Sequence, residues 1–410
     1  MSFVIGARRL LGTASVLALF DLLVVAPPAM AQDRLTVDAS ASVGIATNPF
    51  LDVGPTPTAI NPTLRLHPTW TSDRPLTTLR VEGDVQGTFY NRGYGTNESV
   101  NVQGSGTHKI SEYTTLNASL SYLNTIIGTL NNAYVPVGVA VPIGANLPGF
   151  INDPSLGGIG RRRQSYQASG NIVSLLSPRD QVEVGGSVSA NRFDGTGFNN
   201  FNYAAPSVAY NRTISQNLSI GGSLVVGFSD YLRTAVGDAT IYQPSLTITR
   251  VVSERWTLKG SLGAAIVNLT EPLGQTRTTT SLNGSAELCR RDTRWTACFN
   301  ASRQTVPSAF QGVRTSTSAS ASLGYRVSET DDLSFTGAYS HTGGPLQQNV
   351  GSTRDGSLDF ANAGATYSHR FRPALSGFAS AGYAKTFGDN VKRDANLTAS
   401  VGVTYRFDGR

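Results

Sequence analysis

Cys289 and Cys298 are the only two cysteines among the 410 residues of the chain. A tight turn centred on Thr293 and Arg294 would place them directly opposite each other on neighbouring strands. In an oxidising compartment this placement favours a structural disulfide over the two alternatives, a metal site or a reactive thiol. The disulfide would close only a short loop, so we expect a modest contribution to stability.

Three consecutive arginines, Arg161 to Arg163, follow the segment 127–160, in which Asp153 is the only charged residue. Alternate side chains of a strand share a face, so Arg161 and Arg163 should lie on the face opposite to Tyr166. If that face lines a pore, Asp153, Arg161 and Arg163 are candidates for a constriction that favours anions. The alternative is that the arginines bind the phosphates of lipopolysaccharide at the rim or stay solvated.

No group of residues has the spacing of a known catalytic site. The four histidines are His67, His108, His341 and His369. None stands in a recognisable Ser-His-acid pattern, and the sequence has neither a metal-ligating cluster nor a phosphate-binding glycine loop. We therefore predict a protein that is not an enzyme and has no cofactor. An outer-membrane lipid hydrolase is the weaker alternative.

The segment 397–407 alternates between apolar and polar side chains. Its odd positions carry Leu397, Ala399, Val401, Val403, Tyr405 and Phe407, and its even positions are polar or glycine. The alternation recurs in 116–122, 182–190, 218–228, 256–266 and 333–339. A period of two places every apolar side chain on one face of a β-strand. A single such strand is typical of an ordinary sandwich, but repetition along the whole chain favours a transmembrane barrel.

Short and long connections alternate between these segments. Eight tight, polar turns lie near residues 72–75, 111–113, 177–180, 215–217, 253–255, 291–293, 328–331 and 369–373. Nine longer loops lie near residues 47–61, 93–97, 127–160, 194–199, 233–238, 270–277, 306–313, 343–355 and 388–393. Outer-membrane barrels show this asymmetry, with short periplasmic turns and longer extracellular loops. The sequence therefore predicts an all-β, antiparallel, up-and-down transmembrane barrel of about 18 strands, with 127–160 as its longest loop.

The first 31 residues have the pattern of a cleavable signal peptide. Arg8 and Arg9 precede an apolar stretch, and the small residues Ala29 and Ala31 suit cleavage before Gln32. We expect residues 1–31 to be removed and residues 32–410 to form the barrel in the outer membrane. An uncleaved membrane anchor is the alternative, although the apolar run is short for a spanning helix.

Composition points to the same class of protein. The chain has 43 Gly, 17 Phe and 15 Tyr but only 15% charged residues, a mixture that favours strands and turns over helices. Its net charge of +6 comes from scattered arginines, so nucleic acid is not an expected partner. Ring-bearing residues near strand ends suit the interfacial girdles of a barrel, although each one alone is equally explained by core packing: Trp70, Phe89, Tyr90, Tyr231, Trp256, Tyr383 and Phe387.

Both ends of the expected barrel carry a resemblance to a known family. Residues 42–50 place Asn48 shortly after the first strand, and residues 400–407 are similar to a closing strand that the barrel-assembly machinery recognises. With the repeated hairpins, the chain resembles the type-two family of outer-membrane β-barrel porins. One departure is that three residues follow Phe407, whereas such closing strands often end on Phe. The resemblance implies outer-membrane lipid and lipopolysaccharide, the assembly machinery and polysaccharide-export proteins as partners.

The predicted function is a porin-like channel for the passive passage of small solutes or for export of a secreted polysaccharide. The polar face of the strands is rich in hydroxyls, which would hydrate a channel without holding one ion strongly. The apolar, Pro- and Gly-rich character of 127–160 suits packing inside the barrel. The alternatives are a lumen plugged by the protein's own loops, and a structural or adhesin barrel that acts through its extracellular loops.

Overall fold

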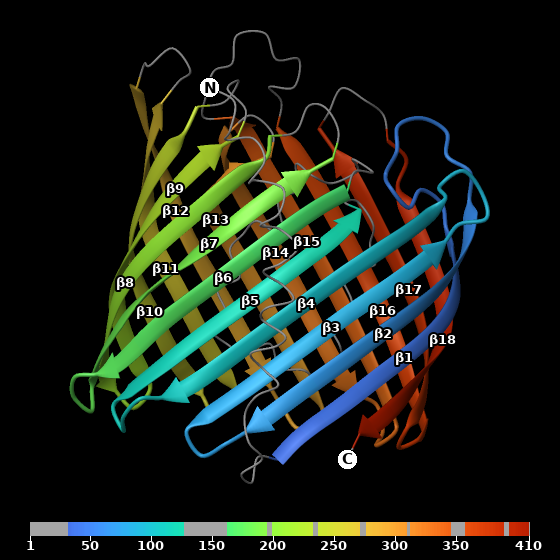
Figure 1. Ribbon diagram of the computed structural model, residues 1–410, viewed down its shortest axis with the longest axis horizontal. Helices are drawn as coiled ribbons and strands as arrows, with labels where there is room; N and C mark the ends of the chain where they lie inside the picture. Colours follow the sequence, from blue (N-terminus) through green and yellow to red (C-terminus); the bar gives the residue numbers. More distant parts are fainter. Residues whose placement is uncertain are drawn as a thin grey trace, which may run out of the picture.

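The computed structural model describes residues 32–126, 162–194, 199–232, 237–270, 276–309, 312–345, 357–388 and 393–409. In these ranges the chain forms one antiparallel sheet of 18 strands that closes on itself as a barrel (Figure 1). The all-β up-and-down barrel predicted from the sequence is therefore confirmed, including its number of strands.

The strands are between 13 and 16 residues long. Their bounds are β1 (Gln32–Ala46), β2 (Ala59–Asp73), β3 (Thr77–Phe89), β4 (Thr96–Lys109), β5 (Thr114–Ile126), β6 (Arg162–Leu175), β7 (Asp180–Phe193), β8 (Phe201–Ser215), β9 (Leu218–Tyr231), β10 (Ala239–Ser253), β11 (Trp256–Thr270), β12 (Thr276–Arg291), β13 (Trp295–Ser308), β14 (Gly312–Arg326), β15 (Asp331–Pro345), β16 (Leu358–Arg372), β17 (Leu375–Phe387) and β18 (Asn396–Gly409).

Each strand pairs with its neighbours in the sequence, and β1 pairs with β18 to close the ring. The register of this seam runs from Leu35↔Gly409 to Ala46↔Thr398. Closure is what a sheet needs in hydrocarbon, because no water is present there to bond to the N–H and C=O groups of a free edge.

The two ends of the barrel differ in their connections. At the end where β18 finishes, all eight connections are turns of two to four residues, and each lies where the sequence predicted one (Figure 1). In five of these turns, the Oγ of a serine accepts a hydrogen bond from the backbone N–H two residues later. The serines are Ser111, Ser177, Ser215, Ser253 and Ser328. The segment 127–160 lies outside the described residues, so its inward course stays a prediction.

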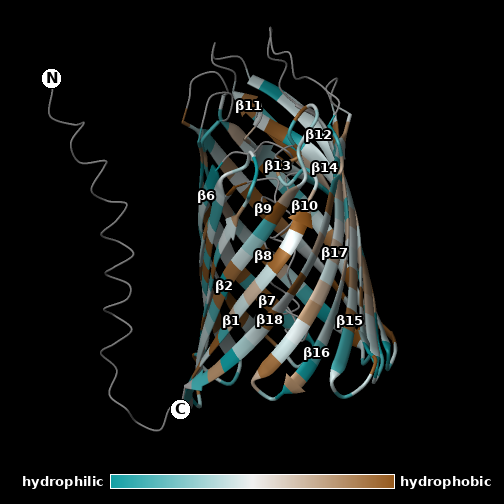
Figure 2. Ribbon diagram, turned by 90° about the vertical axis from the view of Figure 1, so that its right-hand side faces the viewer, coloured by the Kyte–Doolittle hydropathy of each residue, from teal (hydrophilic) through white to brown (hydrophobic). Residues whose placement is uncertain are grey.

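The outer and inner faces of the wall differ in chemistry. Large apolar side chains project outward, and Leu246, Leu262 and Leu282 on adjacent strands are 71%, 63% and 61% exposed. Alternating hydrophobic and hydrophilic positions are visible along the strands in Figure 2. An apolar surface that surrounds the barrel requires a hydrocarbon environment. Within the described ranges, none of the structure is a helix long and apolar enough to cross a membrane.

The loop of residues 47–58, between β1 and β2, contacts the start of β18 at the end that carries the long loops. Asn48 is fully buried, and its backbone N–H donates a hydrogen bond to Oδ1 of Asn396 at 3.1 Å. Its side-chain Nδ2 donates to the backbone oxygens of Asp52 and Asp394 at 3.1 and 3.0 Å. Its Oδ1 accepts from the backbone N–H of Asp52 at 2.8 Å. The polar groups of the Asn48 side chain are thus satisfied by contacts that hold the first and last strands together.

The same loop packs on the connection between β3 and β4. The Phe50 ring lies edge-on to Tyr90 and Tyr94, with centroid distances of 5.7 Å in each case. Burial, and to a lesser extent the neighbouring Tyr94, raise the pKa of Tyr90 to about 12. Leu51 is fully buried with a φ of 54°, a left-handed conformation that the surrounding contacts must stabilise.

Candidate functional site: the pore lumen

Hydroxyl groups from neighbouring strands meet in pairs on the inner wall. Oxygen–oxygen distances of 2.6 to 2.9 Å occur in the pairs Ser40–Thr404, Ser119–Ser169, Ser223–Ser245, Ser261–Ser285, Ser302–Ser318 and Ser380–Ser400. Each hydroxyl retains an acceptor lone pair for water after such a bond. The wall is therefore wettable and carries no charge at these positions.

Several charged side chains on the inner wall lie beside an opposite charge. Arg65 Nε donates to Asp84 Oδ2 at 2.5 Å, and His67 Nδ1 lies 3.5 Å from the same oxygen. Other pairs are Lys259–Glu287 at 3.5 Å, Arg406–Asp38 at 2.8 Å and Arg80–Glu82. Pairing of this kind reduces the net field in the lumen, so it disfavours strong selectivity for one ion.

The most unusual feature of the lumen begins where β13 separates from β12. In the described part of the chain these strands pair only from Arg291↔Thr296 to Gly284↔Arg303. Beyond that point β12 remains fully paired with β11, and β13 remains paired with β14 as far as Ser308↔Gly312. The end of the β13–β14 hairpin has therefore separated from β12, while β14 stays paired with β15 as far as Arg314↔Pro345.

Hydrogen bonds show that this hairpin end lies against the inner face of the barrel. Thr305 is fully buried, and its Oγ1 lies 2.6 Å from Ser281 Oγ and 3.1 Å from Asn283 Oδ1. Gln243 Nε2 of β10 donates to the backbone oxygen of Thr305 at 2.9 Å. Ser281, Asn283 and Gln243 have the parity of lumen-facing residues, so the hairpin crosses the inner faces of β12 and β10.

Apolar contacts fix the same placement. Val313 of the hairpin is fully buried in a cluster with inward-facing residues of β10 and β11, namely Ala239, Ile241, Ala265, Val267 and Leu269. Ala309 packs in a second cluster with Phe193, Phe201, Tyr203, Ala205 and Tyr231, and Val306 packs against it. Next to this cluster, a Cβ on Gly227 would lie 2.4 Å from Tyr203 Oη, so only glycine allows the ring to lie there. Burial of these side chains holds the hairpin inside the barrel.

One sequence expectation is wrong in this region. An extracellular loop was expected near residues 306–313, but β13 extends to Ser308, β14 starts at Gly312, and these two strand ends lie against the inner face of the barrel. For Tyr231 the sequence left an interfacial girdle and core packing open, and the structure shows core packing, because Tyr231 is 6% exposed and lies in the inner cluster. No local signal marks this hairpin, because Pro307 lies where β13 has left β12, but Pro206 and Pro244 lie in strands that stay in the wall.

Of the predicted constriction residues, only Arg163 lies in the described part of the chain. Its side chain is 5% exposed on the lumen face, Nη2 donates to Asn191 Oδ1 at 3.0 Å, and its guanidinium lies 5.9 Å from the centre of the Phe193 ring. Phe193 belongs to the cluster that holds the hairpin, so Arg163 lies beside the inward-turned hairpin end. Asp153 and Arg161 lie outside the described residues.

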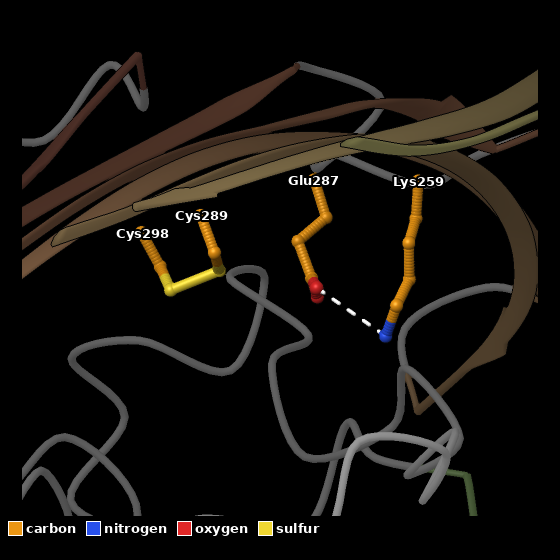
Figure 3. The surroundings of a disulfide bond; sticks show 4 residues. All are labelled: Lys259, Glu287, Cys289 and Cys298. Carbon is orange, nitrogen blue, oxygen red and sulfur yellow. Dashed lines mark ion pairs between the residues drawn. A yellow bond between two sulfur atoms is a disulfide. The ribbon is translucent and has the colours of Figure 1, made fainter. Parts of the chain in front are cut away.

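The two cysteines face each other across β12 and β13. Cys289 and Cys298 are direct cross-strand partners with Cα atoms 4.1 Å apart, and the structure joins them as a disulfide (Figure 3). They project to the same side of the sheet as the Lys259–Glu287 pair, which is the lumen side (Figure 3). The disulfide lies five residues before the point at which β13 leaves the wall, between Gly284 and Arg303.

The histidines are spread over both faces of the barrel. His67 contacts Asp84 in the lumen, whereas His341 and His369 pair with Asp359 and Asp331 on the outer face at 2.8 and 2.7 Å. Among the residues that the structure describes, no group of three or more His, Cys, Asp and Glu side chains is arranged to hold a metal ion.

No protein-family model and no curated protein matches this sequence. Among solved structures, the FrpB iron transporter of Neisseria meningitidis (F3-3 variant) has 8% identity and a TM-score of 0.45, covering 91% of this chain and 81% of that chain. OccK2 (OpdF) of Pseudomonas aeruginosa in complex with glucuronate has 11% identity and a TM-score of 0.44, with coverage of 92% and 98%. The siderophore receptor PirA of Pseudomonas aeruginosa has 10% identity and a TM-score of 0.44, with coverage of 93% and 81%.

The architecture of this chain rests on its own strand pairing and on the chemistry of its two faces. An apolar exterior, a polar interior, short turns at one end and longer connections at the other are the attributes of an outer-membrane barrel. The barrel architecture that the resemblance to outer-membrane porins implies is therefore confirmed. The protein is a multi-pass β-barrel of the outer membrane.

Proposed function

We propose that the protein is a passive channel for small hydrophilic solutes, narrowed on its extracellular side by the β13–β14 hairpin. The observation that carries the proposal is a closed ring of 18 strands with a hydroxyl-lined inner face. Barrels of 16 to 18 strands are wide enough for an aqueous channel, whereas smaller barrels are filled by their own side chains.

The hairpin favours small solutes over a polysaccharide chain as the cargo. Its end covers the inner faces of β10 to β12 and reaches the aromatic cluster on β7 to β9, so it occupies space that a polymer would need. Export of a polysaccharide, with export proteins as partners, is therefore the weaker candidate. The proposal includes two further partners. The barrel-assembly machinery would recognise β18, and lipopolysaccharide would contact the end of the barrel that carries the long loops.

Arg163 gives this channel a mild preference for anions. Its guanidinium faces the lumen beside the hairpin, in a wall whose other features are mostly hydroxyls and paired charges. The preference is mild because Arg163 is only 5% exposed and donates a hydrogen bond to Asn191, so little of its charge reaches the water of the pore.

Reversal potentials across a planar bilayer with a salt gradient test this role. The wild-type channel should favour anions, and Arg163→Ser should move the reversal potential toward cations without loss of folding. Arg162→Ser is the matched control, because Arg162 is the next residue but has the opposite parity and donates to Asn124 Oδ1 on the outer face at 2.9 Å. Equal shifts in both variants, or no shift with Arg163→Ser, would contradict a role in selectivity.

A further inference from the structure

An arginine lies between two indole rings on the outer surface of the barrel. The Arg290 guanidinium carbon is 4.4 Å from the ring centre of Trp295 and 5.4 Å from that of Trp256. Arg290 shares the parity of the lipid-facing Leu288, and Trp256 is its direct partner on β11. The three side chains therefore form a cation–π cluster on the face that contacts lipid.

This cluster lies at the level of the periplasmic headgroups. Trp256 and Trp295 are the first residues of β11 and β13, directly after short turns. Tyr325 on β14 extends this row of aromatic side chains around the barrel, because it is the cross-strand partner of Trp295. Tryptophan and tyrosine at strand ends mark the membrane–water interface of a barrel.

The adjoining turns add further positive charge. Arg255 Nη1 lies 2.9 Å from Asp292 Oδ2, and Arg290 Nη2 lies 3.8 Å from the same oxygen. A hydrogen bond from the Thr293 backbone N–H, and then the charge of Arg255, hold the pKa of Asp292 below its usual value, so the carboxylate stays ionised. Arg294 is exposed beside them, and Glu254 is the other acidic residue of the two turns. Within the described residues, Arg290 Nε has no hydrogen-bond partner.

We propose that Trp256, Arg290 and Trp295, with Arg255, form a binding site for the phosphate of an anionic phospholipid in the periplasmic leaflet. The indoles hold the guanidinium plane in place and offer apolar surface to the glycerol and the start of the acyl chains. The guanidinium donors that remain outside the stack suit the phosphate oxygens. An anionic lipid is favoured over a zwitterionic one because the arginines outnumber the acidic residues at this corner.

Tryptophan fluorescence can report on this site. The chain has three tryptophans, and Trp70 is the only one outside the site. The folded Trp70→Phe barrel should be reconstituted in phosphatidylcholine vesicles that contain increasing fractions of brominated phosphatidylglycerol or, in parallel, brominated phosphatidylcholine. Bromine quenches indole fluorescence on contact, so quenching reports which lipid occupies the site. Phosphatidylglycerol should be preferred by about fivefold, the size expected for one arginine at a membrane surface.

Variants in the same Trp70→Phe background distinguish specific lipid binding at this site from a general attraction between arginines on the barrel and anionic lipid. Arg290→Gln should reduce the preference to near one, and Asp292→Asn should increase it because a competing carboxylate is removed. Arg212→Gln is the matched control, since Arg212 pairs with Asp180 on the outer face at the same end but has no indole neighbours among the described contacts. Equal quenching by the two lipids in the starting chain would overturn the proposal. An equal loss of preference in Arg212→Gln, or no increase with Asp292→Asn, would also overturn it.

Discussion

Thr305 of β13 lies against Ser281 of β12, with 2.6 Å between their hydroxyl oxygens. The register of the two strands, if it continued upward from Gly284↔Arg303, would instead pair Thr305 with Leu282 on the outer face of the wall. The contact shows how the hairpin end has turned into the lumen. It also explains how Thr305 can be fully buried although its parity is that of a lipid-facing residue.

Cysteine cross-linking distinguishes the inward hairpin from a hairpin that stays in the wall. In a chain with Cys289→Ser and Cys298→Ser, the pair Ser281→Cys and Thr305→Cys should form a disulfide readily, because the replaced oxygens are already in contact. The pair Leu282→Cys and Thr305→Cys should not. Mass spectrometry of peptides from the folded, membrane-extracted protein measures both outcomes, and cross-linking of the second pair alone would contradict the inward placement.

Asn48→Ala should weaken the seam between β1 and β18. The substitution removes three side-chain hydrogen bonds at a fully buried position and leaves backbone groups of Asp52 and Asp394 without partners. The free energy of unfolding should fall by about 1–3 kcal/mol, the usual cost of unsatisfied buried groups. Denaturant titration of the detergent-folded barrel measures it. Asn217→Ala, in an exposed turn, should have almost no effect, and equal effects of the two would refute a special role for Asn48.

Cys289 and Cys298 should be linked in protein extracted from the membrane under non-reducing conditions. Replacing both with serine should leave the barrel folded, because the disulfide spans only nine residues of sequence and the two strands are already paired on both sides of it. Peptide mass spectrometry checks the linkage, and heat-resistant migration on a gel checks the fold. Free thiols at both positions would contradict the disulfide, and an unfolded serine variant would contradict its modest contribution.

The wall of the barrel could be predicted from the sequence, but its interior could not. Strict alternation, as in 397–407, determines which side chains face lipid, and serine-led turns such as Ser177 to Asp180 mark the places where strands reverse. These signals are local. They identify all eight short turns and the opposition of Cys289 and Cys298 across one of them.

The inward hairpin depends on contacts between residues far apart in the sequence, and alternation does not encode such contacts. Val313 lies in one cluster with Ile241 and Val267, and Ala309 lies in another with Phe201, but nothing in the sequence around these residues identifies their partners. The same applies to Tyr231, whose ring suits an interfacial girdle as well as a buried cluster. For the same reason the Arg290 cluster was missed, since its two indoles come from different strands.

The central claim is that the barrel conducts small solutes and that the β13–β14 hairpin narrows its lumen. The most direct measurement is single-channel conductance in a planar bilayer, for the wild-type barrel and for a variant in which residues 306–314 are replaced by an Asn-Gly turn. The account predicts a conducting wild-type channel and a larger conductance in the shortened variant, because the residues removed are those packed against the inner wall. If neither protein conducts although both are folded, the protein is a structural or adhesin barrel rather than a channel. Equal conductance of the two would contradict the hairpin as its constriction.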